Sequence, residues 1–237
     1  MNVLAELQTG GTAPHVVMNV LDASLRQSLL DRLTTLTPTP LDAPGTPLHG
    51  VGQWGCMSGP SPKHPRGPAP ERYRSRNQAL WLELAPLSTQ IERQVTAAIA
   101  GLTDCPVSIA PTRAIGSIRR MAGGCGAPAH LDRYPPSAIT DEVRDDVDQE
   151  QQLVWYVMLS RSPAGGVLRT YPGRCVPDTP PDAAAAYQEF DVPNGALLIH
   201  AAARHWHSVT APIGGARITL GGLCLPHRTG DHYWLCA

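Results

Sequence analysis

Residues 204–220 read RHWHSVTAPIGGARITL, and this stretch is the starting point for predicting the fold. A short β-favouring segment around His207 is followed by a turn from Pro212 to Gly215 and by a second β-favouring segment that begins at Arg217. Two such segments joined by a turn rich in Gly and Pro predict a β-hairpin. The hairpin would bring His207 close to Arg217.

Further short β-favouring segments lie upstream and alternate with Gly and Pro turns. Short strands of this kind after a more helical N-terminal third predict a β-barrel or jelly roll that carries helices on one face. The expected strands, in chain order, are residues 117–121, 153–159, 166–170, 196–200, 206–210 and 217–220.

The first 101 residues contain two predicted helices. One spans residues 22–36, where leucines recur at helical spacing and Asp22 or Ser24 can cap the first turn. The other runs from Pro86 to a stop at Gly101. Residues 37–70 between them are crowded with proline and glycine, so we expect no regular structure there. Long loops are often functional lids, and we expect residues 37–73 to order over a substrate and to carry specificity rather than stability.

Composition excludes several classes of protein. The 237 residues include 19 Lys and Arg against 20 Asp and Glu, so the positive surplus of a nucleic-acid-binding protein is missing. No apolar run reaches the roughly 18 to 20 residues that a membrane span needs, and no basic residue precedes Arg26 to begin a signal peptide. The 6 cysteines form no CxxC pair, which argues against a zinc knuckle or a redox motif.

These observations predict a soluble, cytoplasmic protein with reduced thiols. We expect one domain over residues 1–237, in which residues 1–105 give helical support and the lid loop. Residues 106–226 would form the jelly-roll core, and residues 227–237 a tail.

His130 and Asp132 are the first candidate metal ligands. Residues i and i+2 of an extended chain project to the same face, so the imidazole and the carboxylate can meet one metal ion. With His207 they make the set of two histidines and one carboxylate that is typical of non-haem Fe(II) oxygenases. The guanidinium of Arg217 suits the distal carboxylate of a dicarboxylic keto acid.

Other histidines compete for these roles. His205 lies two residues before His207 and would face the same way on a strand, so it is the rival third ligand. His200 is interpreted as a strand residue near the site or as a core polar group, and His227 and His232 as tail residues. Arg119, Arg120 and Arg169 are alternative candidates for the keto-acid clamp.

With these motifs in this order, the sequence resembles the Fe(II)/2-oxoglutarate-dependent oxygenase superfamily, and within it the prolyl-hydroxylase-type branch. The resemblance covers residues 117–226, about half of the chain. It consists of the HxD motif at His130 and Asp132, the Trp-His-x-Val pattern at 206–209, Arg217 ten residues after His207, and the Gly-Gly-x-Leu segment at 165–168.

The resemblance implies a double-stranded β-helix, the cupin-like jelly-roll barrel, supported by α-helices. It implies that His130, Asp132 and His207 bind Fe(II) and that Arg217 binds 2-oxoglutarate, with Leu168 lining that pocket. The branch often has a tyrosine on the strand after HxD, where this chain has Met158; Tyr156 on the same face is expected to take its place.

The implied activity couples oxidative decarboxylation of 2-oxoglutarate to C–H oxidation by O₂, with hydroxylation as the default outcome. The expected substrate is a small molecule such as an amino acid, a short peptide or a specialised metabolite. Candidate substrate contacts are Arg72, Arg74 and Arg133, although the first two also fit a solvated basic face. The alternative functions are a non-catalytic jelly-roll metal-binding protein and a zinc-dependent hydrolase.

Overall fold

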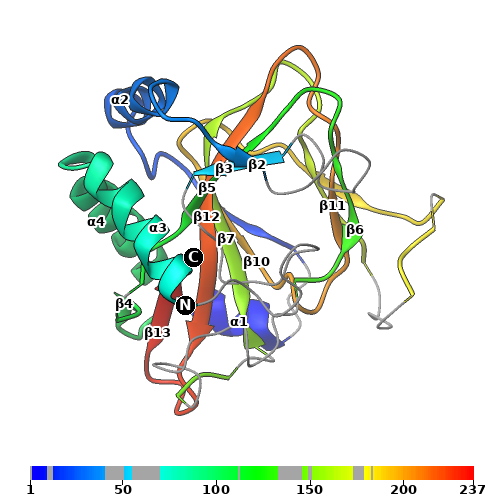
Figure 1. The fold of residues 1–237 in the computed structure, drawn as a ribbon. Helices are drawn as coiled ribbons and strands as arrows, with labels where there is room; N and C mark the ends of the chain where they lie inside the picture. Colours follow the sequence, from blue (N-terminus) through cyan, green and yellow to red (C-terminus); the bar gives the residue numbers. More distant parts are fainter. Residues whose placement is uncertain are drawn as a thin grey trace.

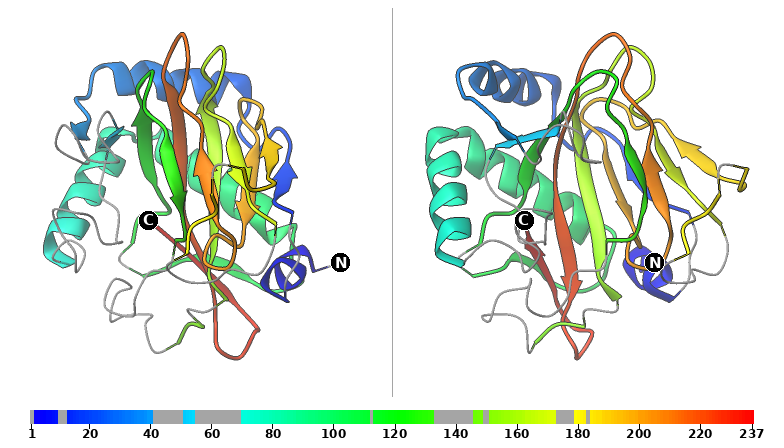
Figure 2. Two further views of the ribbon diagram at one scale, coloured as in Figure 1. Left: turned by 90° about the vertical axis from the view of Figure 1, so that its right-hand side faces the viewer. Right: turned by 45° about the vertical axis from the view of Figure 1, so that its right-hand side comes forward.

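A computed structural model describes residues 2–9, 13–40, 51–54, 70–111, 113–132, 146–148, 151–172, 179–182 and 184–237. The strands form two sheets that face each other, and helices cover the outer side of the larger sheet (Figures 1 and 2). The prediction of a mainly β fold supported by N-terminal helices is confirmed.

Within the described residues the large sheet has nine strands. Their path is β1-β10-β7-β12-β5-β3-β2, and β13 pairs with both β12 and β4. The strands are β1 His15–Val17, β2 Thr39–Pro40, β3 Val51–Trp54, β4 Val107–Ile109, β5 Ser117–Met121, β7 Leu153–Ser160, β10 Leu197–His200, β12 Arg217–Pro226 and β13 Tyr233–Cys236.

The small sheet has four described strands in the order β6-β11-β8-β9. It lies across the face of the large sheet that the helices leave free (Figure 2). We call this face of the large sheet the inner face, and the opposite one the helix face. The four strands are β6 Ala127–His130, β8 Leu168–Thr170, β9 Gln188–Phe190 and β11 His207–Val209.

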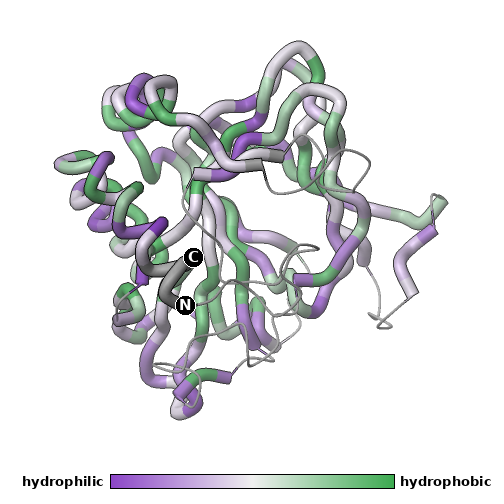
Figure 3. The backbone as a smooth tube through the Cα atoms, viewed as in Figure 1, coloured by the Kyte–Doolittle hydropathy of each residue, from purple (hydrophilic) through white to green (hydrophobic). Residues whose placement is uncertain are grey.

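Strict alternation along β7 separates the two faces. Trp155 and Val157 belong to the main hydrophobic core on the helix face, whereas Tyr156 and Met158 belong to a second cluster between the sheets. Successive side chains of a strand point to opposite faces, so one strand serves both layers. Hydrophobic segments run along the central strands β7 and β12 (Figure 3).

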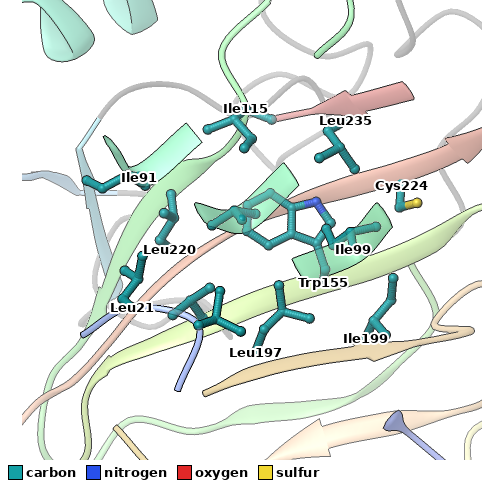
Figure 4. Close-up of a cluster of buried hydrophobic side chains, with 14 of the residues drawn as sticks. Leu21, Ile91, Ile99, Ile115, Trp155, Leu197, Ile199, Leu220, Cys224 and Leu235 are labelled. Carbon is teal, nitrogen blue, oxygen red and sulfur yellow. The ribbon is translucent and has the colours of Figure 1, made fainter. Parts of the chain in front are cut away.

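The helices α1 Val3–Thr9, α2 Ala23–Thr34, α3 Pro70–Glu83 and α4 Leu87–Ala100 complete the fold. Ile91 and Ile99 of α4 point into the same fully buried cluster as Trp155 (Figure 4). For α2, Asp22 is the N-cap, because its carboxylate accepts a hydrogen bond of 2.8 Å from the Leu25 amide. No described helix is long and apolar enough to span a bilayer.

The predicted hairpin between residues 206–210 and 217–220 is wrong. The first segment forms β11, which pairs with β6 and β8 of the small sheet. The second forms the start of β12, which pairs with β5 and β7 of the large sheet. The Pro212 to Gly215 turn therefore carries the chain from one sheet to the other, and local turn signals do not distinguish such a crossing from a hairpin.

The expectation that residues 37–70 lack regular structure is wrong for the described part of that segment. Residues 51–54 form β3, which pairs with β5, and Trp54 is buried in the core. A helix that we did not predict, α3, begins at Pro70. Residues 41–50 and 55–69 of the expected lid lie outside the described residues.

The expectation of a tail at residues 227–237 is also wrong. Tyr233–Cys236 form β13, which pairs antiparallel with β12 and parallel with β4. The Ala237 amide donates a hydrogen bond of 3.0 Å to the Ala114 carbonyl. A parallel partner more than a hundred residues away in the sequence leaves no local signal, which is why the pattern missed this strand.

Trp155 offers a test of the core. Its side chain is fully buried, and its indole N–H donates a hydrogen bond of 3.1 Å to the Leu223 carbonyl. Trp155→Ala should lower the free energy of unfolding by about 3–5 kcal/mol, because it leaves a cavity and an unsatisfied carbonyl. Urea unfolding measures this, with Ile213→Ala as the control, since that side chain is 63% exposed. Equal losses in the two variants would contradict the packing described.

Candidate metal centre

Two histidines face each other across neighbouring strands of the small sheet. His130 of β6 and His207 of β11 are direct partners in the antiparallel register. Directly opposed residues of such a pair point to the same side of the sheet. Their ring centroids are accordingly 4.2 Å apart.

Asp132 completes the cluster two residues after His130. Its carboxylate oxygens lie 3.6 Å from His130 Nε2 and 3.5 Å from His207 Nε2. The Asp132 amide donates to the Ala202 carbonyl at 3.0 Å, and its carbonyl accepts from the Gln152 side chain at 2.6 Å. The aspartate backbone is thus fixed by two other parts of the chain.

The hydrogen bonds of the two rings determine which nitrogen faces the cluster. Nδ1 of His130 is 2.7 Å from the Pro128 carbonyl, and Nδ1 of His207 is 3.3 Å from the His205 carbonyl. Because a carbonyl can only accept, both Nδ1 atoms carry a proton, and each Nε2 points to Asp132. This is the orientation in which two imidazoles can offer their Nε2 lone pairs to one metal ion.

The protonation of the cluster also favours a metal. Partial burial, together with the neighbouring His207, lowers the pKa of His130, which favours the neutral ring that binds metals. Burial opposes the charge of Asp132, but His207, His130 and Arg119 outweigh it and hold the pKa of this carboxyl well below its ordinary value. The described chain therefore places a carboxylate between two imidazoles.

Three ligand atoms, one from each residue, lie within 4.8 Å of one another. The His207 and Asp132 side chains are 5% and 18% exposed, whereas the His130 side chain is 40% exposed. The cluster is thus closed on the His207 side and open to solvent near His130. Two histidines and one carboxylate on one side of an ion leave coordination positions free, as in non-haem Fe(II) sites.

Arg217 lies on the inner face of the large sheet, at the start of β12. Its side chain is buried, and its guanidinium carbon lies 4.8 Å from the centre of the Tyr156 ring. Burial lowers the pKa of Arg217, and no described acidic side chain forms an ion pair with it. The Nε atom of Arg217 and the hydroxyl of Tyr156 are both buried without a hydrogen-bond partner. A buried cation with unused donors is suited to an anion.

The Gly165-Gly166 pair allows the chain to pass close to this arginine. Both residues have positive φ, +64° and +67°. A Cβ at Gly165 would lie 2.1 Å from the Ala211 carbonyl oxygen, and one at Gly166 would lie 3.2 Å from Arg217 Cδ. Leu168 follows in β8, buried in the same inter-sheet cluster as Tyr156. The motif thus brings Leu168, Tyr156 and Arg217 into one region between the sheets.

The structure separates the competing histidines. His207, and not His205, joins the described metal-ligand cluster, while His205 supplies the carbonyl that accepts from His207. His200 lies near the site: its buried ring packs edge-on against His207, with centroids 4.9 Å apart. Burial holds the pKa of His200 well below its ordinary value, so this ring is neutral.

The structure does not place the expected substrate contacts beside the described metal cluster. Arg72 and Arg74 belong to α3, which lies on the helix face, away from β6 and β11 (Figure 1). Arg133 lies outside the described residues. Sequence reasoning missed Gln152, because a contact across 20 residues leaves no local signal.

Comparison with known proteins adds the fold family. No family model matches the sequence, and no curated protein sequence matches it either. Among solved structures, the 2-oxoglutarate-dependent epimerase SnoN from nogalamycin biosynthesis superposes with a TM-score of 0.58 at 14% identity, covering 94% of this chain and 82% of that one. The chain has the fold of the 2OG-Fe(II) oxygenases.

Two further structures with this fold are similar to the chain. HygX from Streptomyces hygroscopicus, with nickel and 2-oxoglutarate bound, matches with a TM-score of 0.55 at 14% identity, over 92% of this chain and 85% of that one. A prolyl hydroxylase from Trichoplax adhaerens, in complex with a peptide fragment, matches with a TM-score of 0.51 at 14% identity, over 97% and 90%. The prediction of the jelly-roll fold of 2OG-Fe(II) oxygenases is confirmed.

The metal cluster can be tested by removing its members. His207→Ala and Asp132→Ala should each weaken Co(II) binding more than about 100-fold, because loss of a ligand exceeds the 10- to 100-fold effect of losing an outer-shell partner. Isothermal titration calorimetry measures the affinity. His205→Ala is the matched control, since it keeps the backbone carbonyl that orients His207. If His205→Ala lost Co(II) binding and His207→Ala retained it, His205 and not His207 would be the third ligand.

Proposed function

We propose that this chain is a non-haem Fe(II) oxygenase that uses 2-oxoglutarate and O₂ to oxidise a C–H bond of a small molecule. The observation that carries the proposal is the occurrence, within one inter-sheet space, of the His130, Asp132 and His207 cluster and the buried guanidinium of Arg217. Its Nε atom has no hydrogen-bond partner, and no described acidic side chain forms an ion pair with it. A binding protein or a hydrolase has no need of a cation that fits a dicarboxylic keto acid.

His130, Asp132 and His207 would hold the metal. When bound, Fe(II) supplies the redox chemistry that couples O₂ to the conversion of 2-oxoglutarate into succinate and CO₂, with one oxygen atom left for the substrate. The carbonyls of Pro128 and His205, which accept from the Nδ1 atoms, would keep both Nε2 atoms available to the ion. Three protein ligands leave room for the cosubstrate and for O₂.

Arg217 would bind the distal carboxylate of 2-oxoglutarate. Its fork of N–H donors matches a carboxylate, and burial strengthens the attraction by excluding water. Tyr156 supports the guanidinium through its ring, and its unpaired hydroxyl is available to the same carboxylate. Leu168 would line the aliphatic part of the pocket.

The substrate would approach from the exposed side of His130. Hydroxylation is the outcome that we propose, and an amino acid, a short peptide or a specialised metabolite is the proposed substrate class. Support comes from the range of similar folds, which includes HygX in complex with hygromycin B and an N-substituted L-amino acid dioxygenase from Burkholderia ambifaria. Arg133, which directly follows Asp132 in the sequence, remains a proposed substrate contact. Arg72 and Arg74 remain proposed contacts only for a substrate that also reaches α3 on the helix face.

The proposed cofactors can be tested directly on the purified protein. Anaerobic addition of Fe(II) and 2-oxoglutarate should give a weak visible charge-transfer band, and O₂ should then yield succinate slowly without substrate. Zn(II) in place of Fe(II) should give neither. Hydrolysis of an ester or amide with Zn(II), together with no band with Fe(II), would favour the zinc alternative, and no activity with either metal would favour a binding protein.

Arg217 can be tested through the affinity for 2-oxoglutarate. Arg217→Gln removes charge-assisted hydrogen bonds of roughly 1.5 to 3 kcal/mol each, so the affinity should fall by at least about tenfold. Metal affinity should be unchanged, because Arg217 lies in the other sheet from His130 and His207. Calorimetric titration of the metal-loaded protein measures both quantities, and an unchanged affinity for 2-oxoglutarate would place the clamp elsewhere.

A further inference from the structure

A second arginine, Arg119, projects from the inner face of the large sheet. On β5 its neighbour Ile118 is buried in the core on the helix face, so Arg119 points the opposite way. Arg119 is the direct partner of Thr219 on β12, two residues along from Arg217. Directly opposed residues share a face, as do residues i and i+2, so both arginines point toward the small sheet.

Among the described residues, no acidic partner explains the position of Arg119. Its Nε atom is buried without a hydrogen bond, as is the Nε atom of Arg217. No described acidic side chain forms an ion pair with either arginine. Arg217 is buried and Arg119 is half-buried. Keeping cationic groups out of water without a compensating anion costs free energy, so these two on one face indicate a ligand that brings negative charge to both.

The location of Arg119 relative to the metal cluster indicates which part of such a ligand would carry the negative charge near it. On both strands that flank the turn from Pro212 to Gly215, the chain leads away from the turn. His207 is two residues further from it than Val209 on β11, and Thr219 is two residues further from it than Arg217 on β12. Arg119, the direct partner of Thr219, is therefore displaced from Arg217 toward the end of the inter-sheet space that holds His207. A molecule that extends from the metal to Arg217 would pass beside it.

We propose that Arg119 binds the carboxylate at the keto-acid end of 2-oxoglutarate, so that Arg119 and Arg217 hold the two ends of one dicarboxylate. The inference rests on the proposed function and deepens it. In 2-oxoglutarate the two carboxylates are joined by one keto carbon and two methylene groups, and the keto-acid carboxylate is the one that meets the metal. A single dianion would then pair with both guanidinium groups.

Arg119 would do more than add affinity. Its planar fork would also fix the plane in which the keto-acid carboxylate is held. The neighbouring Arg120 cannot share this role, because it is exposed and points away from the inner face. It has the same chemistry one residue away on the same strand, and is therefore a matched control.

The experiment compares two keto acids on the Mn(II)-loaded protein by isothermal titration calorimetry. 2-Oxobutyrate has the keto-acid end of 2-oxoglutarate and lacks the distal carboxylate. Arg119→Gln should weaken the binding of both compounds by at least about tenfold, whereas Arg217→Gln should weaken 2-oxoglutarate and leave 2-oxobutyrate within about twofold. Arg120→Gln should leave both affinities unchanged.

A stability measurement separates ligand binding from a structural role. Since no described acidic side chain pairs with Arg119, Arg119→Gln should unfold at the same temperature as the unaltered protein or at a higher one, and should retain its Mn(II) affinity. A large fall in the unfolding temperature would show that the arginine supports the fold and would overturn the proposal.

Other results would overturn it in different ways. If Arg119→Gln binds both keto acids as tightly as the unaltered protein, the carboxylate near Arg119 does not come from the cosubstrate, and a carboxylate on the oxidised substrate is the remaining source. If it weakens 2-oxoglutarate alone, Arg119 belongs to the distal clamp. If the unaltered protein binds neither keto acid, the proposed function fails, and this inference fails with it.

Discussion

The pairing of β12 with β5 on one side and β7 on the other is the constraint on which the rest of the structure depends. It places one long strand at the centre of the large sheet, with Leu220 and Cys224 in the helix-face core and Arg217 and Thr219 on the inner face. Two glycines allow neighbouring backbone to approach it. A Cβ at Gly221 would lie 2.7 Å from the Trp155 carbonyl oxygen, and one at Gly222 would lie 2.3 Å from that of Cys236.

The two faces of this sheet serve opposite purposes. The helix face is apolar and fully buried, so it supplies the free energy that holds the domain together. The inner face carries buried polar atoms without partners, among them Ser117 Oγ, Tyr156 Oη and Arg217 Nε. Such atoms cost stability, and a fold tolerates them where a ligand makes use of them. The apolar packing on the helix face thus offsets the stability that the unpaired polar atoms on the inner face cost.

Sequence patterns predicted those parts of the molecule whose signal is local. The HxD spacing and the β-favouring residues around His207 predicted residues that the structure brings together, and β5 was predicted with its observed bounds, Ser117–Met121. The partners of each strand were not predictable, because hydrogen bonding between β4 and β13 or between β3 and β5 depends on contacts remote in the sequence. The same limit explains why the predicted hairpin is wrong. The turn signal shows where the chain changes direction, but not that the strands before and after it belong to different sheets.

The position of Arg119 illustrates a signal that was available and went unused. Alternation along Ser117–Met121 separates Ile118 from Arg119, and this pattern alone puts the arginine opposite the core face. Sequence reasoning treated it only as a replacement for Arg217. The structure adds the register of β5 with β12. Arg119 is the partner of Thr219 and is therefore a neighbour of Arg217 rather than an alternative to it.

The metal cluster draws its members from distant parts of the chain, His130 and Asp132 on one side and His207 on the other, and these meet only when β6 and β11 pair. An unfolded chain cannot assemble them, so an ion held by all three binds the native state alone. By mass action, a ligand at 100 times its Kd adds about 2.7 kcal/mol to the free energy of unfolding. The stability of the folded protein would then depend on the concentrations of metal and keto acid around it. A shortage of either would increase the unfolded fraction of the chain, and with it the rate of proteolysis.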